Sequence, residues 1–235
     1  GDTLVDDKYG DVKMTVQVCN PPYSLKWSSD KKFEDDPRYS GVGKLAPKSA
    51  ADLAFVEHMI YHMDDEDGRV AVLLPHGVLF RGGAEEAIRK YIIKDLNRLD
   101  AVIGLPANLF HGTGIPVCVL VLKSKRNGNS DNVMFIDASK EFKPGKNQNT
   151  LEQEHIDKIV DAYVKREEIE KFAHKAKMSE IIENDYNLNI PRYVDTFEEE
   201  EPVDLVAVKA EIQKLDTETR AAIDKAESMM RLLGL

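Results

Sequence analysis

Asn20, Pro21, Pro22 and Tyr23 are the residues whose types and spacing most directly suggest chemistry. They follow an apolar run, and the two prolines lack backbone donors and fix φ where a strand would end. The Asn20 amide oxygen and the Pro21 carbonyl are two acceptors held in one direction, and Tyr23 adds a flat ring. Such a site suits a planar ring that bears an amino group.

A pair of acceptors of this kind has a chemical use. The exocyclic amine of adenine is a poor nucleophile, because its lone pair is delocalised into the ring. Acceptors that bind both N–H groups favour a pyramidal nitrogen and free the lone pair. The amine can then attack a methyl sulfonium held in line without a strong general base, and positioning supplies much of the rate. The alternative interpretation is a strand-ending Asn-Pro turn or a proline-rich docking peptide.

The elements that must position these residues alternate between strands and helices. Helical spacing of apolar residues predicts helices over 49–63, with Ser49 as N-cap, and over 82–96. Apolar runs predict strands over residues 12–19, 69–75, 99–106, 115–124 and 132–139. This alternation is typical of an α/β fold, in which helices cover both faces of a mostly parallel sheet.

Two details of this sheet follow from the chain. Ligands of open α/β sheets bind beyond the carboxyl ends of the strands, which is where Asn20 to Tyr23 stand. The runs 99–106 and 115–124 have no helix between them, so we expect an antiparallel pair at one edge of the sheet. Residues 24–48 read as a long polar loop, and loops of this length are usually functional or disordered.

The second part of the chain is predicted to be mainly helical. Residues 150–173 read as a helix capped by Thr150, and residues 178–195 as a loop-like connector. From Leu205 the apolar or small positions are spaced by alternating steps of three and four, which predicts a heptad seam on a helix of about 30 residues. This seam could pack on a partner helix or on the chain's own core. Its positions are 205, 208, 212, 215, 219, 222, 226, 229 and 233.

Composition narrows the possible partners and compartments. The 235 residues carry a formal net charge of −10, which argues against binding nucleic acid by bulk electrostatics alone. Cys19 and Cys118 lie in apolar runs and read as buried free thiols of a reducing cytoplasm. No cysteine–histidine spacing resembles a zinc site, and we expect no metal. No apolar run approaches the ~20 residues of a membrane span, and no leader opens the chain.

Several longer stretches carry a resemblance to a known family. NPPY, LLPHGVLFRGGAEEAIRKYII, LDAVIGLPANLFHGTGIPVCVLVLKSK, FIDAS and NDYNLNIPRY together resemble the modification (methyltransferase) subunits of type I restriction systems. These subunits are a branch of the adenine-N6 DNA methyltransferases. The resemblance runs from residue 1 to about residue 195. It implies S-adenosyl-L-methionine as cofactor, DNA as substrate, a specificity subunit that meets the C-terminal helices, and a restriction subunit in the full complex.

The resemblance also implies roles for single residues. Asn20, Pro21, Pro22 and Tyr23 match the catalytic motif, in which Asn and the first Pro carbonyl bind the target amine and Tyr stacks on the flipped base. Phe110 matches the aromatic residue that packs on the adenine from the far side. The segment GDTL matches the stretch whose Asp2 would meet the adenine of the cofactor.

The sequence departs from the family pattern at one place. The family has a glycine-rich cofactor loop and an acidic ribose-binding residue upstream of the motif, and GVGKL at 41–45 follows the motif and does not replace them. The first residue is Gly rather than Met, so we expect a fragment that is inactive in isolation. We expect residues 1–143 to be the second half of a Rossmann-like methyltransferase domain. Residues 144–202 would be a helical connector, and residues 203–235 a long helix.

Other interpretations of these residues stay open at this point. Phe110 could be a core residue, His111 a solvated loop residue rather than a base, and His76 a contact to cofactor or substrate. The cations of the polar loop could be a solvated face or could bind phosphate beside an extruded base. These are Lys26, Lys31, Lys32, Arg38, Lys44 and Lys48. A non-catalytic interaction module with a methyltransferase half-fold is the alternative to an enzyme. NPPY enzymes of RNA or protein are a third class, which the later motifs disfavour.

Overall fold

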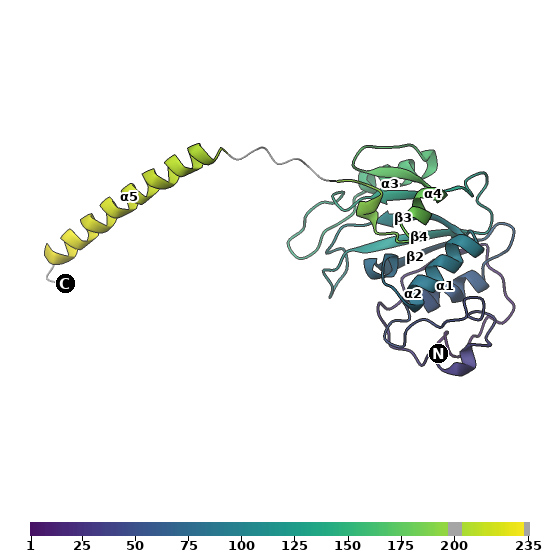
Figure 1. Ribbon diagram of the computed structural model, residues 1–235. Coiled ribbons are helices and arrows are strands. Elements are labelled where there is room, and N and C mark those ends of the chain that lie inside the picture. The colour runs from purple at the N-terminus through teal and green to yellow at the C-terminus, as the bar shows by residue number, and fades with distance from the viewer. Residues whose placement is uncertain (197–203, 233–235) are drawn as a thin grey trace. The chain divides into compact units, whose positions relative to one another are not determined.

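The computed structural model describes residues 1–196 and 204–232 of the chain, which divide into two units (Figure 1). Residues 1–196 form one compact unit built on a six-stranded sheet, and helix α5 (Leu205–Leu232) belongs to the second. The strands are β1 (Val16–Cys19), β2 (Arg69–Pro75), β3 (Leu99–Gly104), β4 (Val117–Lys123), β5 (Asn132–Asp137) and β6 (Ala173–Lys177).

Four α-helices and several short turns complete the first unit. The helices are α1 (Asp52–Tyr61), α2 (Ala84–Lys90), α3 (Gln153–Lys165) and α4 (Met178–Glu183). Helix α2 continues into a π-helical turn, η3 (Tyr91–Asp95), and the 3-10 turns are η1 (Lys31–Phe33), η2 (His76–Leu79) and η4 (Ile190–Arg192). No helix within the described ranges combines the length and apolarity that crossing a bilayer requires.

The strand order is β1-β2-β4-β3-β5-β6, and four of these strands run in one direction. Strand β1 is parallel to β2, and β3 is parallel to β5, whereas β4 and β6 are antiparallel to their neighbours. The α/β class and the antiparallel pairing of β3 with β4 are therefore confirmed. The expected position of that pair at an edge is wrong, because β4 lies between β2 and β3. Its alternate residues Cys118, Leu120 and Leu122 are buried, as a central strand requires.

The segment after residue 143 differs from the prediction in three ways. Helix α3 begins after Glu152, whose side chain and that of His155 cap the helix reciprocally, so Thr150 is not the cap. The helix ends at Arg166, which has a left-handed φ of 52° and whose guanidinium bonds Asp100 and Asn132. The predicted helix over 150–173 is therefore too long, because residues 166–172 are not helical and Ala173 begins β6 (Ala173–Lys177), which was not predicted. Residues 178–183 form α4 rather than a loop.

Two layers of apolar side chains hold the sheet between its helices, with α1 and α2 on one face and α3 on the other (Figure 1). Strand β5 serves both layers, because successive side chains of a strand point to opposite faces. Phe135 belongs to the α1 and α2 layer, and Met134 and Ile136 belong to the α3 layer. Tyr193 stacks on Phe135 with ring centroids 3.8 Å apart. Residues 144–196 belong to the same compact unit as residues 1–143.

The polar loop 24–48 is held by an aromatic cluster of its own. The rings of Trp27 and Phe33 stack with centroids 5.6 Å apart, and Tyr39 meets both of them edge-on. All three side chains are buried, and the Trp27 indole donates to the Pro47 carbonyl over 3.1 Å. Helix α1 starts at Asp52, so Ser49 is not its N-cap.

Candidate active site

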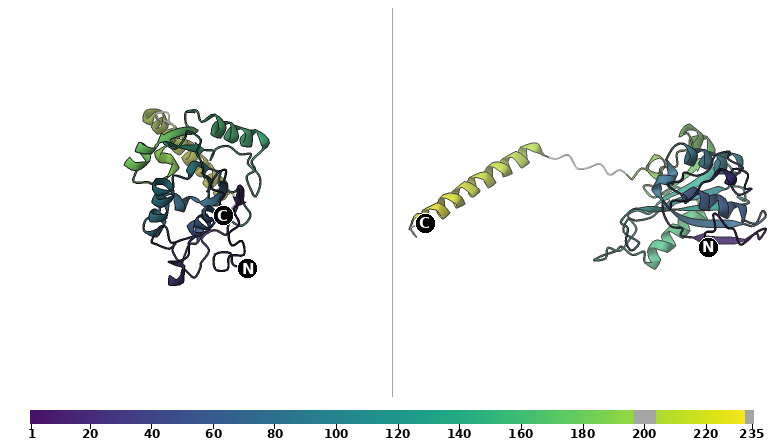
Figure 2. Two further views of the ribbon diagram at one scale, coloured as in Figure 1. Left: turned by 90° about the vertical axis from the view of Figure 1, so that its right-hand side faces the viewer. Right: turned by 90° about the horizontal axis from the view of Figure 1, so that it is seen from below.

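The Asn20–Tyr23 motif comes directly after β1, at the carboxyl end of an edge strand. Strand β1 pairs with β2 over Val16 to Cys19 and has no strand on its other side among the described residues. The strand stops here because Pro21 and Pro22 have no N–H to give to a ladder. Pro21 is buried, whereas Asn20 and Pro22 are exposed. Figure 2 shows the purple N-terminal part of the chain along this border of the sheet.

A groove of about 510 Å³ runs along β1 and ends at the motif. Asn20, Pro21 and Pro22 line it, and Tyr23 does not. Its other walls come from β1, from helix α1 and from the N-terminal segment. They are Thr3, Tyr9, Met14, Val16, Gln17, Val18, Cys19, Phe55, Met59, His58 and His62. The groove therefore places mixed apolar and polar walls beside the two acceptors of the motif.

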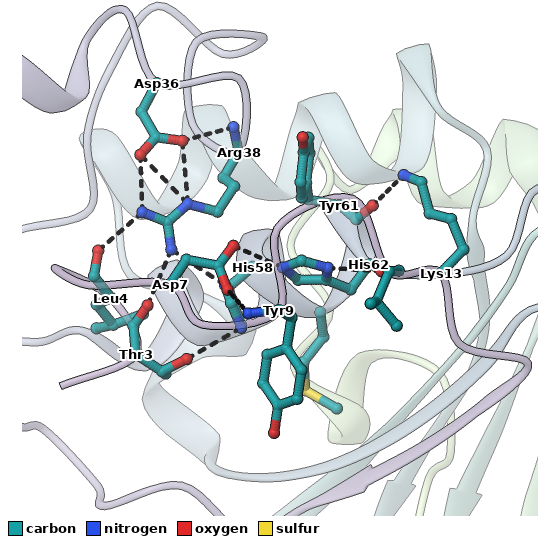
Figure 3. A network of polar contacts seen from close by, with 12 residues as sticks. Thr3, Leu4, Asp7, Tyr9, Lys13, Asp36, Arg38, His58, Tyr61 and His62 are labelled. Carbon is teal, nitrogen blue, oxygen red and sulfur yellow. Dashed lines mark hydrogen bonds and ion pairs between the residues drawn. The ribbon is translucent and has the colours of Figure 1, made fainter. Parts of the chain in front are cut away.

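A hydrogen-bonded network fastens the N-terminal wall of the groove to helix α1 (Figure 3). His62 contacts the Val12 carbonyl through Nδ1 at 2.8 Å and the Asp7 carboxylate through Nε2 at 2.9 Å. Both ring nitrogens of His62 therefore face oxygen acceptors, which fixes the orientation of the ring. Burial raises the pKa of Asp7, but hydrogen bonds from Tyr9 and His62 outweigh it and leave that pKa below its usual value.

His58 occupies the second position of this network. Its Nδ1 accepts from the Arg38 guanidinium at 3.2 Å, so its Nε2 carries the proton and contacts the Thr3 hydroxyl at 3.3 Å. Burial, together with the neighbouring charges of His62 and Arg38, lowers the pKa of His58 to about 4. The ligand atoms of Asp7, His58 and His62 lie within 4.8 Å of one another. Because these atoms already bond one another or Arg38, we interpret the group as a structural tie.

Asp2 lies at the edge of this region and does not line the groove. Its side chain is exposed, and its carboxylate accepts from the Leu4 backbone at 3.0 Å. Its carbonyl accepts from Val5 and Asp6, which makes a tight turn. The neighbouring residue, Thr3, is the one that reaches the groove wall. A contact between Asp2 and a cofactor therefore stays a prediction.

Tyr23 and Phe110 pack on the same apolar layer beneath α3, although they come from distant parts of the chain. Phe110 lies in the 105–116 loop between β3 and β4, and both rings are partly buried. The Tyr23 hydroxyl is buried and has no hydrogen-bond partner in the described part of the chain. Burial raises the pKa of Tyr23, so the phenol is neutral at physiological pH.

The remaining candidates separate into structural and exposed residues. His76 bonds the Val117 carbonyl through Nε2 at 3.0 Å and so ties η2 to β4, whereas His111 is exposed. The Arg38 guanidinium bonds Asp36 and the carbonyls of Thr3 and Leu4, and its side chain is 5% exposed. Arg38 is therefore not a free cation of the loop. The five lysines of the loop are exposed.

Sequence reasoning missed Asp52, the first residue of α1. Its carboxylate is fully buried and accepts from the backbone N–H of Ser24 at 2.8 Å, directly after the motif. An acidic residue in the first turn of a helix is common, so the sequence signal was indistinguishable from ordinary helix-end chemistry. The contact depends on how the motif folds back on α1.

The family model and the relatives found by comparison with known proteins point to the same family. The family described as N-6 DNA methylase matches residues 1–202. The type I restriction enzyme MpnII methylase subunit of Mycoplasma pneumoniae is 42% identical over 202 residues, which are 85% of this chain and 37% of that protein. The MjaVII methylase subunit of Methanocaldococcus jannaschii is 35% identical over 236 residues, covering 96% of this chain and 40% of that protein.

A solved structure agrees with these relatives. The type I restriction-modification methyltransferase subunit of Streptococcus thermophilus superimposes with a TM-score of 0.79 at 55% identity, over 83% of this chain and 42% of that one. The chain thus spans about two fifths of the length of these two curated relatives. The groove, the motif and these relatives agree with the resemblance seen in the sequence: the chain belongs to the N-6 DNA methylase family, with the methylase subunits of type I restriction enzymes as its relatives.

Proposed function

We propose that this chain is part of an S-adenosyl-L-methionine-dependent methyltransferase that modifies the exocyclic N6 amine of an adenine turned out of DNA. The proposal assigns it to the modification subunit of a type I restriction-modification complex. The observation that carries this proposal is the Asn-Pro-Pro-Tyr motif at the carboxyl end of β1, beside a groove of about 510 Å³, in a chain of the N-6 DNA methylase family.

We propose that the motif acts by positioning the target amine for attack. The Asn20 amide oxygen and the Pro21 carbonyl accept the two N–H groups of the target amine, which frees the nitrogen lone pair for attack. Tyr23 stacks on one face of the extruded base, and Phe110 packs on the other. This chemistry needs no strong base, which agrees with the structural contacts of His76 and the exposed position of His111.

The groove along β1 fits part of the cofactor. Its aromatic and apolar walls, Tyr9, Phe55 and Met59, suit a nucleoside, and Thr3 and Asn20 offer polar groups at its rim. S-adenosyl-L-methionine supplies the electrophilic methyl group when it is bound. Asp2, one residue from Thr3, is the proposed contact to the cofactor adenine. The glycine-rich loop that the family uses is not in this sequence, so these residues would form only one side of the cofactor site.

The proposed partners follow from charge and from the exposed helix. The net charge of −10 requires that much of the DNA contact comes from partners or from local cations such as the exposed lysines of residues 24–48. We assign α5 to docking on the long helices of a specificity subunit, with a restriction subunit in the full complex. Recognition of the DNA sequence would then lie outside this chain.

Methyl transfer by the full-length subunit with its partners tests the proposal. Asn20→Ala removes one acceptor from the reacting amine, and loss of such a contact costs on the order of 3 kcal/mol, or ~100-fold in rate. Tyr23→Ala should also reduce transfer strongly, and Phe110→Ala more mildly. Asn129→Ala, a partly buried asparagine in the turn between β4 and β5, is the matched control. Wild-type turnover by the Asn20 variant would remove the catalytic assignment.

Two alternatives have different outcomes in the same assay. A non-catalytic interaction module with a methyltransferase half-fold would bind no S-adenosyl-L-methionine in the full-length subunit, and it would transfer no methyl group. An enzyme of RNA or protein would transfer the group to those substrates and leave unmodified DNA untouched. Labelled methyl transfer to each of the three substrates therefore separates the classes.

A further inference from the structure

The turn that follows the motif is held in an unfavourable backbone conformation. Ser24 has a φ of 50°, in the left-handed region that residues other than Gly rarely adopt. The next residue, Leu25, gives its carbonyl to the backbone N–H of Ala51 at 2.9 Å. The chain after Tyr23 is therefore bent sharply back onto the start of helix α1, and something must stabilise the bend.

The Asp52 carboxylate is the group that stabilises this bend. Its Oδ1 accepts from the Ser24 backbone N–H at 2.8 Å, and its side chain is 0% exposed. A hydrogen bond to an ionised acceptor is stronger than one between neutral groups. The carboxylate lies in the first turn of the ten-residue α1, where the helix dipole favours a negative charge. Its Oδ2 lies 3.9 Å from the Arg81 guanidinium and has no hydrogen-bond partner in the described ranges.

We propose that Asp52 is a positioning residue: by holding the Ser24 amide it fixes the direction in which Asn20, Pro21 and Tyr23 present their acceptors and ring. This inference rests on the proposed methyl transfer and deepens it. Arg81, which also contacts Glu85 at 3.4 Å, balances the charge of the buried carboxylate. Because Pro21 and Pro22 stiffen the motif, the bend at Ser24 is transmitted to the acceptors as a change of direction.

Three variants separate positioning from ordinary structural support. Asp52→Asn keeps an oxygen that accepts from Ser24, and Asp52→Ala removes it. Ser24→Gly makes the left-handed turn free of side-chain strain, so it should partly rescue Asp52→Ala. Glu85→Gln is the matched control, because it removes a buried carboxylate that contacts the same Arg81 rather than the Ser24 backbone.

Kinetics of the full-length subunit provide the first measurement. We expect Asp52→Ala to lower kcat at least ~10-fold with KM for DNA and cofactor unchanged, since a small misplacement near a reacting group has effects of that size. Asp52→Asn and the double variant with Ser24→Gly should recover most of that loss, and Glu85→Gln should keep wild-type kcat. Unchanged kcat in Asp52→Ala, or equal losses in Asp52→Asn and Asp52→Ala without rescue by Ser24→Gly, would overturn the proposal.

Amide hydrogen exchange of this chain provides a second measurement that needs no activity. The Ser24 amide should exchange at least ~10-fold faster in Asp52→Ala than in the wild type, and Asp52→Asn should restore its protection. If the wild-type subunit transfers no methyl group but the Ser24 amide shows this pattern, the proposed function is wrong, whereas the role of Asp52 in fixing the motif is supported. Equal exchange rates of the Ser24 amide in the wild type and in Asp52→Ala would refute that role.

Discussion

Asn20 and Pro21 are useful because each presents an acceptor without a competing local donor. The backbone nitrogen of Pro21 carries no hydrogen, and that of Pro22 carries none either, so the acceptors are not consumed by a turn of their own. Their direction comes from outside the motif, from the Asp52 contact to Ser24. The motif itself therefore supplies the acceptors, whereas a contact outside the motif sets the direction in which they point.

His58 provides a pH-dependent test of the wall of the groove. Its folded pKa of about 4 lies below the ordinary value near 6.5, so the unfolded chain binds the extra proton more readily. His58 therefore does not reduce the free energy of unfolding above about pH 6.5, and it reduces that free energy as the pH falls toward 4. At pH 5 the free energy of unfolding is lower by about 2 kcal/mol than it is well above pH 6.5. His58→Gln, which keeps an acceptor for Arg38, should flatten this loss in urea unfolding at pH 5 and pH 7.

His174 is the control, because its pKa is shifted in the opposite direction to that of His58 and its effect on stability has the opposite pH dependence. Burial lowers its pKa, but hydrogen bonds to Glu180 and Glu168 outweigh burial and hold the pKa above the ordinary value. Its contribution to stability is present below about pH 6.5 and is lost as the pH rises through the folded pKa. His174→Gln should therefore destabilise the chain more at pH 5 than at pH 8. The same slope in both histidine variants would contradict the assignment.

Strand β1 presents an exposed edge of the sheet. Val16 and Val18 are 66% and 79% exposed, and one edge of the strand has no partner among the described residues. Exposed strand edges with apolar side chains pair with other chains. In the proposed full-length subunit, a further strand would cover this edge and complete the cofactor groove.

The isolated chain should associate with itself through β1. We expect its sedimentation coefficient to rise with concentration, and Val18→Lys should hold it at the monomer value because a charge on an edge strand opposes pairing. Val164→Lys is the control, since Val164 is 69% exposed on helix α3 and lies away from the edge. If both lysine variants associate like the wild type, the β1 edge is not the contact.

Helix α5 confirms the helical prediction for the end of the chain. It runs for 28 residues, and none of its residues is buried. The predicted seam from Leu205 to Met229 lies on this helix, whereas its last position, residue 233, falls outside the described residues. Thr219 and Ala226 place small residues in the seam, so its middle offers less apolar area than its start. A helix cannot bury such a stripe on itself.

Assembly with a specificity subunit tests the seam. Ile212→Asp combined with Leu215→Asp removes two large apolar residues, each of which is worth ~2 kcal/mol or more in a packed seam. We expect the complex to be lost in size-exclusion chromatography with light scattering, while the circular dichroism of the first unit stays unchanged. Val206→Asp with Gln213→Asp changes the same helix next to the seam and should leave the complex intact. Unchanged affinity of the seam variant would favour internal packing of α5.

At the scale of the whole molecule, we propose that the chain forms one side of a cofactor site. Its groove residues supply a wall and the acceptors, and the sequence has no glycine-rich loop to bind a nucleotide through backbone N–H groups. We therefore expect calorimetric titration of this chain with S-adenosyl-L-methionine to show no tight binding. The full-length subunit is the positive control. A micromolar dissociation constant for the isolated chain would refute this view of the site.

The sequence by itself determined most of the strands, the motif and the family. Five of the six strands could be predicted, because long apolar runs such as Arg69–Pro75 and Leu99–Gly104 have no other stable place than a buried sheet. The motif could be recognised because two prolines after a strand have a local meaning that does not depend on the fold. The heptad spacing of α5 is local in the same sense.

Only the tertiary structure decided which segments meet. Strand β4 inserts between β2 and β3 through pairing across the chain, and β6 forms from Ala173–Lys177, a polar and alanine-rich stretch, because β5 offers it a free edge. The buried contacts of Arg38 with Thr3 and Leu4, and of Asp52 with Ser24, join residues about 30 positions apart. Local composition shows a charged residue at such positions but not its partner, because partners are set by packing of distant segments rather than by neighbours in sequence.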